Sequence, residues 1–419
     1  MKKVTLALIG AGERGSDSYA PYALSHPQEA QCVAVAEPNS ARREKFRKMH
    51  NISEDMCFNT WEEMLEKPKL ADAVLICVQD GLHLPVTIKA LEKDYHVLLE
   101  KPMSNKPEDC VLMGEYAKRY KKVFSICHVL RYTNFFSALK KYIDDGRIGD
   151  LVSIQLNENV AYWHQAHSFV RGNWRNSNET SPMILAKSCH DMDILLWLAG
   201  ADCVSLSSFG SLMHFKKENA PEGAPLRCLD GCPVENECPY YAPNQYLTSN
   251  IYWPTSVISD DMSIESRTKA LKEGPYGRCV YQCDNNVVDH QVVCAEFANG
   301  VTAAFTMCAF TQDGNRTLKL MGTKAEIRAV LEKNEIEILD FAIGSREVIH
   351  LATGGSSHSG GDYMLIRDFI KLVRDNAAGE GRTSASISVQ SHLMAFAAEK
   401  SRLEKKAINM KEYAEGFKK

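Results

Sequence analysis

The stretch VTLALIGAGERG, residues 4–15, joins a continuous apolar run to three glycines spaced G-x-G-x-x-G. A helix-like stretch, Ser16 to Leu24, follows it, and a second apolar run ends in an acid, Glu37, which stands 22 residues after Gly15. The glycine pattern alone is a weak signal. Placed after a strand and before a helix, with an acid at that spacing, it is typical of a dinucleotide-binding turn.

Each glycine has a physical role in such a turn. Gly10 permits the tight bend, Gly12 lets the backbone approach a pyrophosphate, and Gly15 allows the helix to pack against the strand. A carboxylate at Glu37 accepts hydrogen bonds from ribose hydroxyls and repels a 2′-phosphate, which favours NAD over NADP. Arginines at 42 and 43 partly oppose this preference. The alternative interpretation is a glycine turn that serves packing alone.

Strand-like and helix-like segments then alternate as far as residue 129, from the strand Ala73–Val78 to the strand Phe124–Val129. This alternation predicts a doubly wound parallel sheet, with a ligand at the carboxyl ends of its strands. The pattern predicts a Rossmann domain over 1–128 and a second domain over 129–419. The predicted cofactor-binding residues at these strand ends are Gly10, Gly12, Glu13, Arg14, Gly15, Glu37, Gln79, His83, Glu100 and Lys101.

Bulk composition narrows the classes of partner. With 419 residues, two domains are expected. The net charge is −4 and no dense basic stripe is present, so neither nucleic acid nor an anionic membrane is predicted as a partner. The first apolar run is too short for a signal peptide, and no run approaches the roughly 20 apolar residues of a membrane span. The fourteen cysteines are sparse for this length, which favours reduced thiols in the cytoplasm.

The tripeptide Glu100-Lys101-Pro102 ends a predicted strand at the edge where a nicotinamide would lie. A lysine at that point could polarise or deprotonate a substrate oxygen while hydride leaves the adjacent carbon. The alternative is a surface lysine that caps the strand.

These motifs together resemble the Gfo/Idh/MocA family of glucose–fructose oxidoreductase and inositol dehydrogenase relatives. The matching features are GAGERG, Glu37, EKP at 100–102, HVLRY at 128–132 and His190-x-x-Asp193. The resemblance covers essentially the whole chain. It implies a Rossmann domain followed by an α+β domain with a large open, mostly antiparallel sheet. It also implies homo-oligomers and substrates that are sugars, polyols or their derivatives.

Carried over residue by residue, the resemblance makes Lys101 the catalytic lysine and His190 the catalytic histidine. The family's D-x-x-x-H aspartate falls on Ala186, with Lys187 beside it, so Lys187 joins the predicted catalytic set. This departure puts the usual alcohol-dehydrogenase proton relay in question. The cofactor site is unaffected by it.

The segment 182–198 places the polar side chains of Lys187, His190 and Asp191 along one stripe of an otherwise apolar helix. Because only one histidine is present, metal binding is disfavoured and an acid–base role is favoured, with Asp191 or Asp193 orienting the ring. Each residue also has a purely structural interpretation. His190 could be a structural histidine, Asp193 could form an i,i+3 hydrogen bond within the helix, and the flexible side chain of Lys187 could extend to the rim of the cleft.

Residues 158–176 are dense in tryptophan, histidine and arginine and show no regular period after residue 162, which predicts a loop. Aromatic faces pack against sugar rings, and two arginines would suit a carboxylated or sulfated sugar. A structural loop anchored by its tryptophans is the alternative. The predicted substrate residues are His128, Arg131, Glu158, Trp163, His164, Arg171, Trp174, Arg175 and Asp193.

A cysteine-rich insertion is predicted over about 216–285. Because this stretch is rich in Pro and Gly, we expect it to need a stabilising cross-link such as a structural metal or a disulfide. A structural zinc site is predicted on four of its thiols. The ligands would be Cys228, Cys232, Cys238 and either Cys279 or Cys283. Free thiols, a redox or disulfide role and an iron–sulfur cluster are the alternatives.

Three functions stay open from the sequence. The first is an NAD-dependent oxidoreductase that moves hydride between a sugar or polyol hydroxyl and nicotinamide. The second is a glycoside-cleaving enzyme that oxidises a ring carbon transiently and recycles bound NAD, which the missing aspartate motivates. The third is a non-catalytic NAD or sugar sensor, against which the presence of Lys101 and His190 argues.

Overall fold

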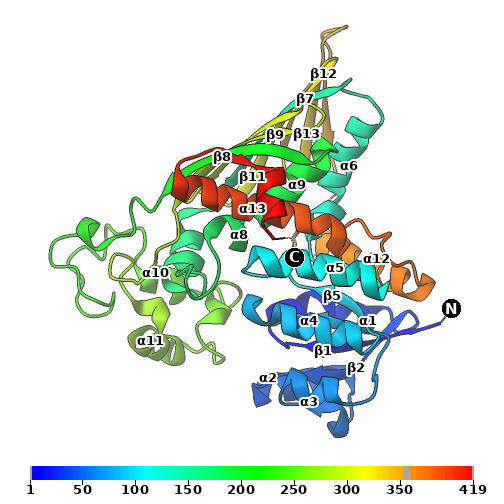
Figure 1. Cartoon of the computed structure of the whole chain (residues 1–419). Coiled ribbons are helices and arrows are strands. Elements are labelled where there is room, and N and C mark those ends of the chain that lie inside the picture. Colours follow the sequence, from blue (N-terminus) through cyan, green and yellow to red (C-terminus); the bar gives the residue numbers. More distant parts are fainter. Residues whose placement is uncertain (1, 353–357, 418–419) are drawn as a thin grey trace.

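The computed structural model describes residues 2–352 and 358–417, and it stacks two sheets along the long axis of the molecule (Figure 1). A smaller parallel sheet lies at one end and a large twisted sheet at the other. A layer of helices lies between them, and the cysteine-rich insertion extends to one side. This is the predicted combination of a Rossmann domain and an α+β domain.

The amino-terminal sheet is parallel, with the strand order β3-β2-β1-β4-β5-β6 in the described part of the chain. Its strands are β1 (Val4–Ile9), β2 (Ala30–Ala36), β3 (Cys57–Phe58), β4 (Ala73–Ile76), β5 (His96–Leu99) and β6 (Phe124–Ile126). Its helices are α1 (Pro21–Ser25), α2 (Ser40–His50), α3 (Trp61–Glu66), α4 (His83–Glu92) and α5 (Pro107–Tyr120). Continuous apolar strands suit this sheet because helices cover both of its faces. The helix expected from Ser16 to Leu24 is instead a wide π-helical turn, Glu13–Tyr19, followed by α1.

The second sheet is mostly antiparallel, with the order β14-β13-β12-β11-β7-β10-β9-β8-β15; only β10 and β7 pair in parallel among its described strands. Its strands are β7 (Leu151–Asn159), β8 (Cys203–Ser211), β9 (His290–Phe297), β10 (Thr302–Cys308), β11 (Asn315–Gly322), β12 (Ala325–Val330), β13 (Glu335–Asp340), β14 (Arg346–His350) and β15 (Ile408–Asn409). The remaining helices of the described chain are α6 (Asn134–Asp144), α7 (Tyr162–His164), α8 (Met183–Ala186), α9 (Cys189–Ala199), α10 (Ala242–Tyr246), α11 (Ile264–Glu273), α12 (Gly361–Asp375), α13 (Ala385–Glu404) and α14 (Met410–Glu415). Side chains alternate between buried and exposed along β9, because one face of the sheet packs on helices.

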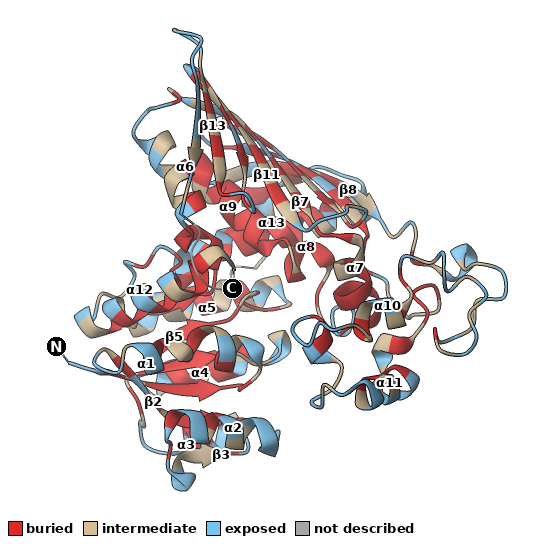
Figure 2. Ribbon diagram, turned by 180° about the vertical axis from the view of Figure 1, so that it is seen from behind, coloured by how far each residue is buried: buried red, intermediate tan, exposed pale blue. Residues whose placement is uncertain are grey.

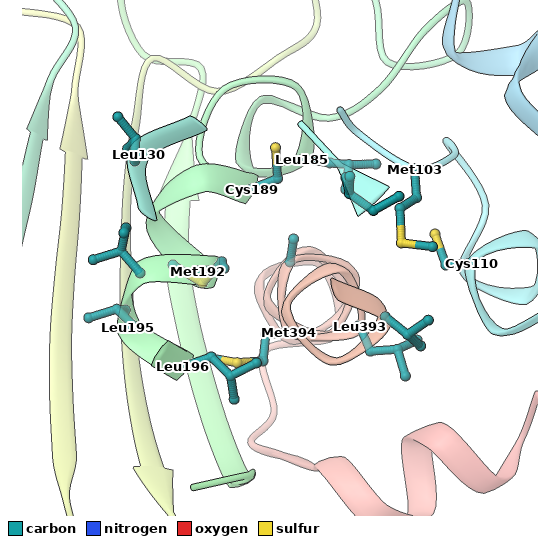
Figure 3. Close-up of a cluster of buried hydrophobic side chains, with 14 of the residues drawn as sticks. Met103, Cys110, Leu130, Leu185, Cys189, Met192, Leu195, Leu196, Leu393 and Met394 are labelled. Atoms are coloured by element: carbon teal, nitrogen blue, oxygen red, sulfur yellow. The ribbon is translucent and has the colours of Figure 1, made fainter. Parts of the chain in front are cut away.

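The helix α13 joins the two sheets. Figure 3 shows it end-on, surrounded by apolar side chains from α5, α8 and α9. Met103, Leu185 and Met192 contribute to this cluster, and each is at most 1% exposed. Because one continuous core runs through this layer, the site between the two sheets has a rigid floor.

The helix α12 packs against the Rossmann sheet, although it lies within the predicted second domain, 129–419. Its apolar face, including Leu365 and Phe369, packs in the same cluster as Leu6 and Leu8 of β1. The chain therefore returns to complete the Rossmann core. Sequence order could not indicate this, because the contact joins residues more than 350 positions apart.

The insertion has a small core of its own, in which Tyr246 and Leu271 pack with Cys228. In a second cluster, Tyr240 of the insertion packs with Phe215 and with Val170 of the main body. Figure 2 shows these buried patches inside an otherwise exposed lobe. Among the described helices, none is both long and apolar enough to cross a bilayer.

Candidate active site

The glycine turn has the shape that a dinucleotide requires. Gly10 has φ +94°, and a Cβ there would meet Cys77 O at 2.4 Å. A Cβ at Gly15 would meet Gly10 O, also at 2.4 Å, whereas one at Gly12 would meet nothing within 4 Å. Gly10 and Gly15 are therefore required by packing, and the space at Gly12 opens toward the position of a bound pyrophosphate.

Glu37 stands beside this turn, just after β2. It is 7% exposed, and its two carboxylate oxygens accept from the backbone N–H groups of Ala11, at 2.7 Å, and Asn39, at 2.9 Å. Arg43 donates to the Glu37 carbonyl, while Arg42 lines the neighbouring pocket. The carboxylate is thus fixed next to the glycine turn, where an adenosine ribose would lie.

Arg14 belongs to an ion-pair network under the turn. Its Nε lies 2.6 Å from Glu100 and its Nη2 lies 2.6 Å from Asp362 at the start of α12. Burial by itself would raise the pKa of Glu100, but Arg14 and Lys101 outweigh burial and hold that pKa below its usual range. The structure therefore gives Arg14 a supporting position, with its guanidinium turned toward these two carboxylates.

Lys101 connects the two domains. Its Nζ donates to the carbonyl of Ala186, the last residue of α8, at 3.1 Å, and its own N–H donates to Glu100. The Lys101–Pro102 peptide is cis. The ring of His83, predicted to touch the cofactor, bonds Pro102 O at 2.8 Å and Val78 O at 3.1 Å. His83 thus braces the lysine loop against the end of β4.

Three histidine rings gather at the start of α9. His190 is 6% exposed, and its ring lies 5.8 Å from that of His128, which in turn lies 5.2 Å from the ring of His392 on α13. Burial lowers the pKa of His128 to about 4, with Asp193 opposing the shift. Lys101 is close enough to His128 and Cys189 to act on the pKa of each. The strand-end lysine and the helix that carries His190 therefore converge.

His128, Arg131 and Asp193, predicted to bind substrate, are buried near the start of α9. Arg131 Nε and Nη2 donate to the carboxylate of Asp193 at 2.6 and 2.7 Å, and the two residues are 3% and 1% exposed. His128 is fully buried. The carboxylate of Asp193 is therefore held by Arg131. Burial would raise the pKa of Asp193, but Arg131 lowers it below its usual range.

A chain of charges starts at Lys187. Its Nζ lies 3.3 Å from Glu158 on β7; Glu158 lies 2.5 Å from Arg316 on β11, and Arg316 lies 2.7 Å from Asp191. Glu158 and Arg316 are direct partners across the two strands. Burial raises the pKa of Asp191 to about 6, against the effect of Arg316. Arg316 was missed by the sequence analysis, because nothing local marks it on an ordinary alternating strand.

The segment expected to be a loop is helical. Residues Tyr162–His164 form α7 and Gln165–Arg171 continue as a wide helical turn, every residue of which is buried. A helix buried on all sides shows no polar stripe, which is why its period was hidden. Burial lowers the pKa of His164 well below its ordinary value, because it disfavours the charged ring. The positive charges of Lys187 and Lys101 lower this pKa further.

An aromatic group covers this end of the site. Trp163 and His164 lie edge-on to Trp253 of the insertion, with ring separations of 5.5 and 4.9 Å. Trp253 was not among the predicted residues, because only the fold brings position 253 beside position 164. Trp174 packs on Phe169 at 6.4 Å and is 38% exposed.

The two arginines of this segment have other partners. Arg171 is fully buried and donates to the carbonyls of Arg278 and Tyr240. Arg175 pairs with Asp284 through both nitrogens, at 2.7 and 2.9 Å. Both therefore fasten the insertion, and the structure gives no support to their predicted use on an acidic sugar.

The cysteines predicted to bind zinc line one small cavity: Cys228, Cys232, Cys238 and Cys279. Within residues 2–352 and 358–417, no group of three or more His, Cys, Asp or Glu side chains is arranged to hold a metal ion. The positive charge at this cavity belongs to Arg171, whose guanidinium lies 3.6 Å from Cys228 Sγ. Cys283, the alternative ligand, donates to Cys279 O. The structure therefore does not support the zinc prediction.

Comparisons with known proteins agree with this arrangement. Residues 4–128 match the Gfo/Idh/MocA model described as "Oxidoreductase family, NAD-binding Rossmann fold", and residues 140–377 match the family's "C-terminal alpha/beta domain". The chain belongs to the Gfo/Idh/MocA family of oxidoreductases, as its motifs predicted. The amino-terminal domain is the NAD-binding one.

Individual relatives are distant. "Putative oxidoreductase YteT" of Bacillus subtilis (strain 168) is 24% identical over 392 residues, which cover 88% of each chain. Inositol 2-dehydrogenase of Corynebacterium glutamicum (strain R) is 26% identical over 211 residues, 49% of this chain and 57% of that protein. The structure of a levoglucosan dehydrogenase with NADH and levoglucosan aligns over 98% of this chain and 100% of its own, with a TM-score of 0.73 and 17% identity. At that identity the likeness shows the fold alone.

Proposed function

We propose that the protein is an NAD-dependent dehydrogenase of a sugar or polyol hydroxyl, with Lys101 and His190 handling the proton. The observation that carries the proposal is the bond from Lys101 Nζ to Ala186 O, because it brings the Rossmann lysine onto the segment that leads to His190. The sugar and inositol dehydrogenases among the relatives support the substrate class.

The residues fit the cofactor. The open space at Gly12 suits a pyrophosphate, and the fixed carboxylate of Glu37 suits ribose hydroxyls and disfavours a 2′-phosphate, which supports NAD over NADP. Bound nicotinamide supplies the hydride acceptor. Lys101 would polarise the reacting hydroxyl, and His190 would receive its proton. Trp163 and His164 would face the sugar ring, and Lys187 would stand where the usual aspartate is missing.

The test is a panel of sugars and polyols with NAD and with NADP, followed by the absorbance of the reduced cofactor. For an active substrate, Lys101→Met and His190→Asn are each expected to lower kcat by about 100-fold or more. Lys106→Met is the matched control, because Lys106 lies exposed in the same loop. Intact turnover in either site variant would overturn the assignment. No turnover of any compound, with NAD still bound, would favour a sensor.

Ala186 keeps a second candidate open: redox-assisted cleavage of a glycoside. In that reaction a ring hydroxyl is oxidised to a ketone, the neighbouring C–H loses a proton, and elimination expels the leaving group. Addition of water and return of the hydride then give net hydrolysis with no net change of NAD. Glycoside cleavage without accumulation of NADH, with deuterium from D2O entering the sugar ring, would select this candidate over the first.

The cytoplasmic location and the homo-oligomer remain predictions. In support of the oligomer, Phe209 and Val292 are neighbours across β8 and β9 on the outer face of the large sheet, and they are 64% and 38% exposed. Light scattering of the purified protein would test for it; a monomeric mass would contradict it.

A further inference from the structure

A pocket of about 530 Å³ lies between the Rossmann domain and the cysteine-rich insertion. The residues that line it on the two sides include Gly12, Asn39 and Arg42, and Val257, Asp260 and Met262. The insertion lobe that supplies the second side, with α11 at its end, extends beside α2 in Figures 1 and 2. Two parts of the chain more than 200 residues apart thus share one pocket.

The pocket coincides with the place for the adenosine half of a dinucleotide. Ala11 and Asn39, whose N–H groups hold the carboxylate of Glu37, both line it, as does Gly12. Gly12 and the residues that hold Glu37 would therefore place a pyrophosphate and an adenosine ribose in the space that the insertion also lines. Its volume lies in the range of ordinary small-molecule sites.

The insertion side of the pocket is held firmly. Arg267 is 3% exposed and donates to the carbonyls of Tyr246 and Thr248. Ser263 caps α11 by accepting from Ser266 N, and the Ser259 and Ser266 hydroxyls bond at 2.9 Å. A wall whose shape is already fixed loses little entropy when a ligand binds.

The same segment reaches the other end of the site. Trp253 lies edge-on to His164 and His167, with ring separations of 4.9 and 5.6 Å. Val257, four residues later, already lines the pocket. One short stretch, residues 253–257, therefore extends from the aromatic group around His164 to the pocket beside Gly12.

We propose that residues 256–262 form the outer wall of the adenosine half of the cofactor site, so that NAD is enclosed between the insertion and the Rossmann domain and dissociates slowly. The proposal rests on the NAD-dependent function above. The proposed catalytic residues Lys101 and His190 lie outside the insertion. The proposal therefore assigns the insertion a role in retaining the cofactor.

The first test uses a charge introduced on the wall. Val257→Glu would add a negative charge to the wall of the pocket, and this charge would repel the diphosphate of a bound dinucleotide. ADP-ribose and NAD are expected to bind about tenfold or more weakly by calorimetry, and NAD to dissociate faster by stopped flow. Ile264→Glu is the matched control: Ile264 lies in the same insertion, is 47% exposed against 43% for Val257, and is not part of the pocket lining.

The second test needs no variant. Hydrogen exchange of the backbone at 255–262 is expected to slow with ADP-ribose and to stay unchanged with nicotinamide mononucleotide, which lacks the adenosine half. Equal exchange with and without ADP-ribose, or wild-type affinity in Val257→Glu, would overturn the proposal and leave the dehydrogenase function standing. A wild-type protein that binds neither NAD nor ADP-ribose would overturn both.

Discussion

Lys101 Nζ donates to the backbone carbonyl of Ala186 at 3.1 Å, at the position where the family pattern has an aspartate. A carbonyl accepts a hydrogen bond but cannot take up a proton at neutral pH, so it holds the lysine without supplying a base. The chain has thus kept the placement of its lysine and lost one acidic group. Lys187, the next residue, carries a positive charge in its place.

Replacing Lys187 tests whether it serves the reaction. Lys187→Met removes one of the two cations paired with the buried Glu158 carboxylate, and it removes a positive charge near His164. We expect kcat/KM to fall about tenfold or more, with NAD affinity unchanged, and Lys187→Arg to restore most of the loss. Steady-state kinetics and NAD titration measure this. Unchanged kinetics in the Met variant would show that Lys187 only fills space at the rim.

Replacing Glu37 tests cofactor choice. In Glu37→Ala the ribose loses its acceptor and a 2′-phosphate is no longer repelled. NAD affinity is expected to fall about tenfold and the NAD-to-NADP preference to narrow or reverse. Titration with both cofactors measures the ratio. A preference unchanged by the substitution would mean that other residues set it.

Replacing Arg316 is expected to lower the free energy of unfolding more than replacing an arginine in an exposed ion pair. Its guanidinium neutralises Glu158 and Asp191, which are 3% and 0% exposed, so Arg316→Met leaves two buried carboxylates without it. Loss of one partner from a buried charge network typically costs about 3–5 kcal/mol in the free energy of unfolding.

Arg175→Met is the comparison, because Arg175 pairs with the half-exposed Asp284, and such pairs contribute about 1 kcal/mol or less. Denaturant unfolding of both variants measures the difference. Equal losses would contradict the charge network described for Arg316.

Burial of His128 is expected to make the free energy of unfolding depend on pH. Its pKa is about 4 in the folded protein against 6.5 for a free imidazole, because burial disfavours the charged ring. Between pH 6.5 and pH 4, His128 is therefore mostly protonated in the unfolded chain and mostly neutral in the folded chain. Above pH 6.5 this residue does not lower the free energy of unfolding. As the pH falls from 6.5 toward 4, it lowers that free energy by roughly 3 kcal/mol.

His128→Gln is expected to flatten this part of the profile. Thermal unfolding between pH 4 and pH 7, with and without the substitution, measures it. An identical pH slope in the two proteins would exclude His128 as a source of the acid sensitivity.

Local pattern predicted the amino-terminal half of the site well. The glycine turn, Glu37 and the lysine of Glu100-Lys101-Pro102 lie where parallel strands end, and strand ends in such a sheet meet at one edge whatever lies beyond.

Pattern failed where partners come from far along the chain. Arg131 and Arg171 look like substrate arginines in sequence, yet each has buried partners at least 60 residues away. Conversely, Arg316, His392 and Trp253 show no local sign of the site that they help to form.

The sequence by itself determined the cofactor turn and the family, because these depend on motifs within a few residues of one another. The catalytic roles of Lys101 and His190 follow from the family resemblance and stay predictions. Only the tertiary structure decided which polar residues face the site and which lie under it. It also placed α12 in the Rossmann core and residues 256–262 opposite the glycine turn. The reason is that side-chain pairing and burial follow from packing between distant segments, and a one-dimensional pattern carries no record of those contacts.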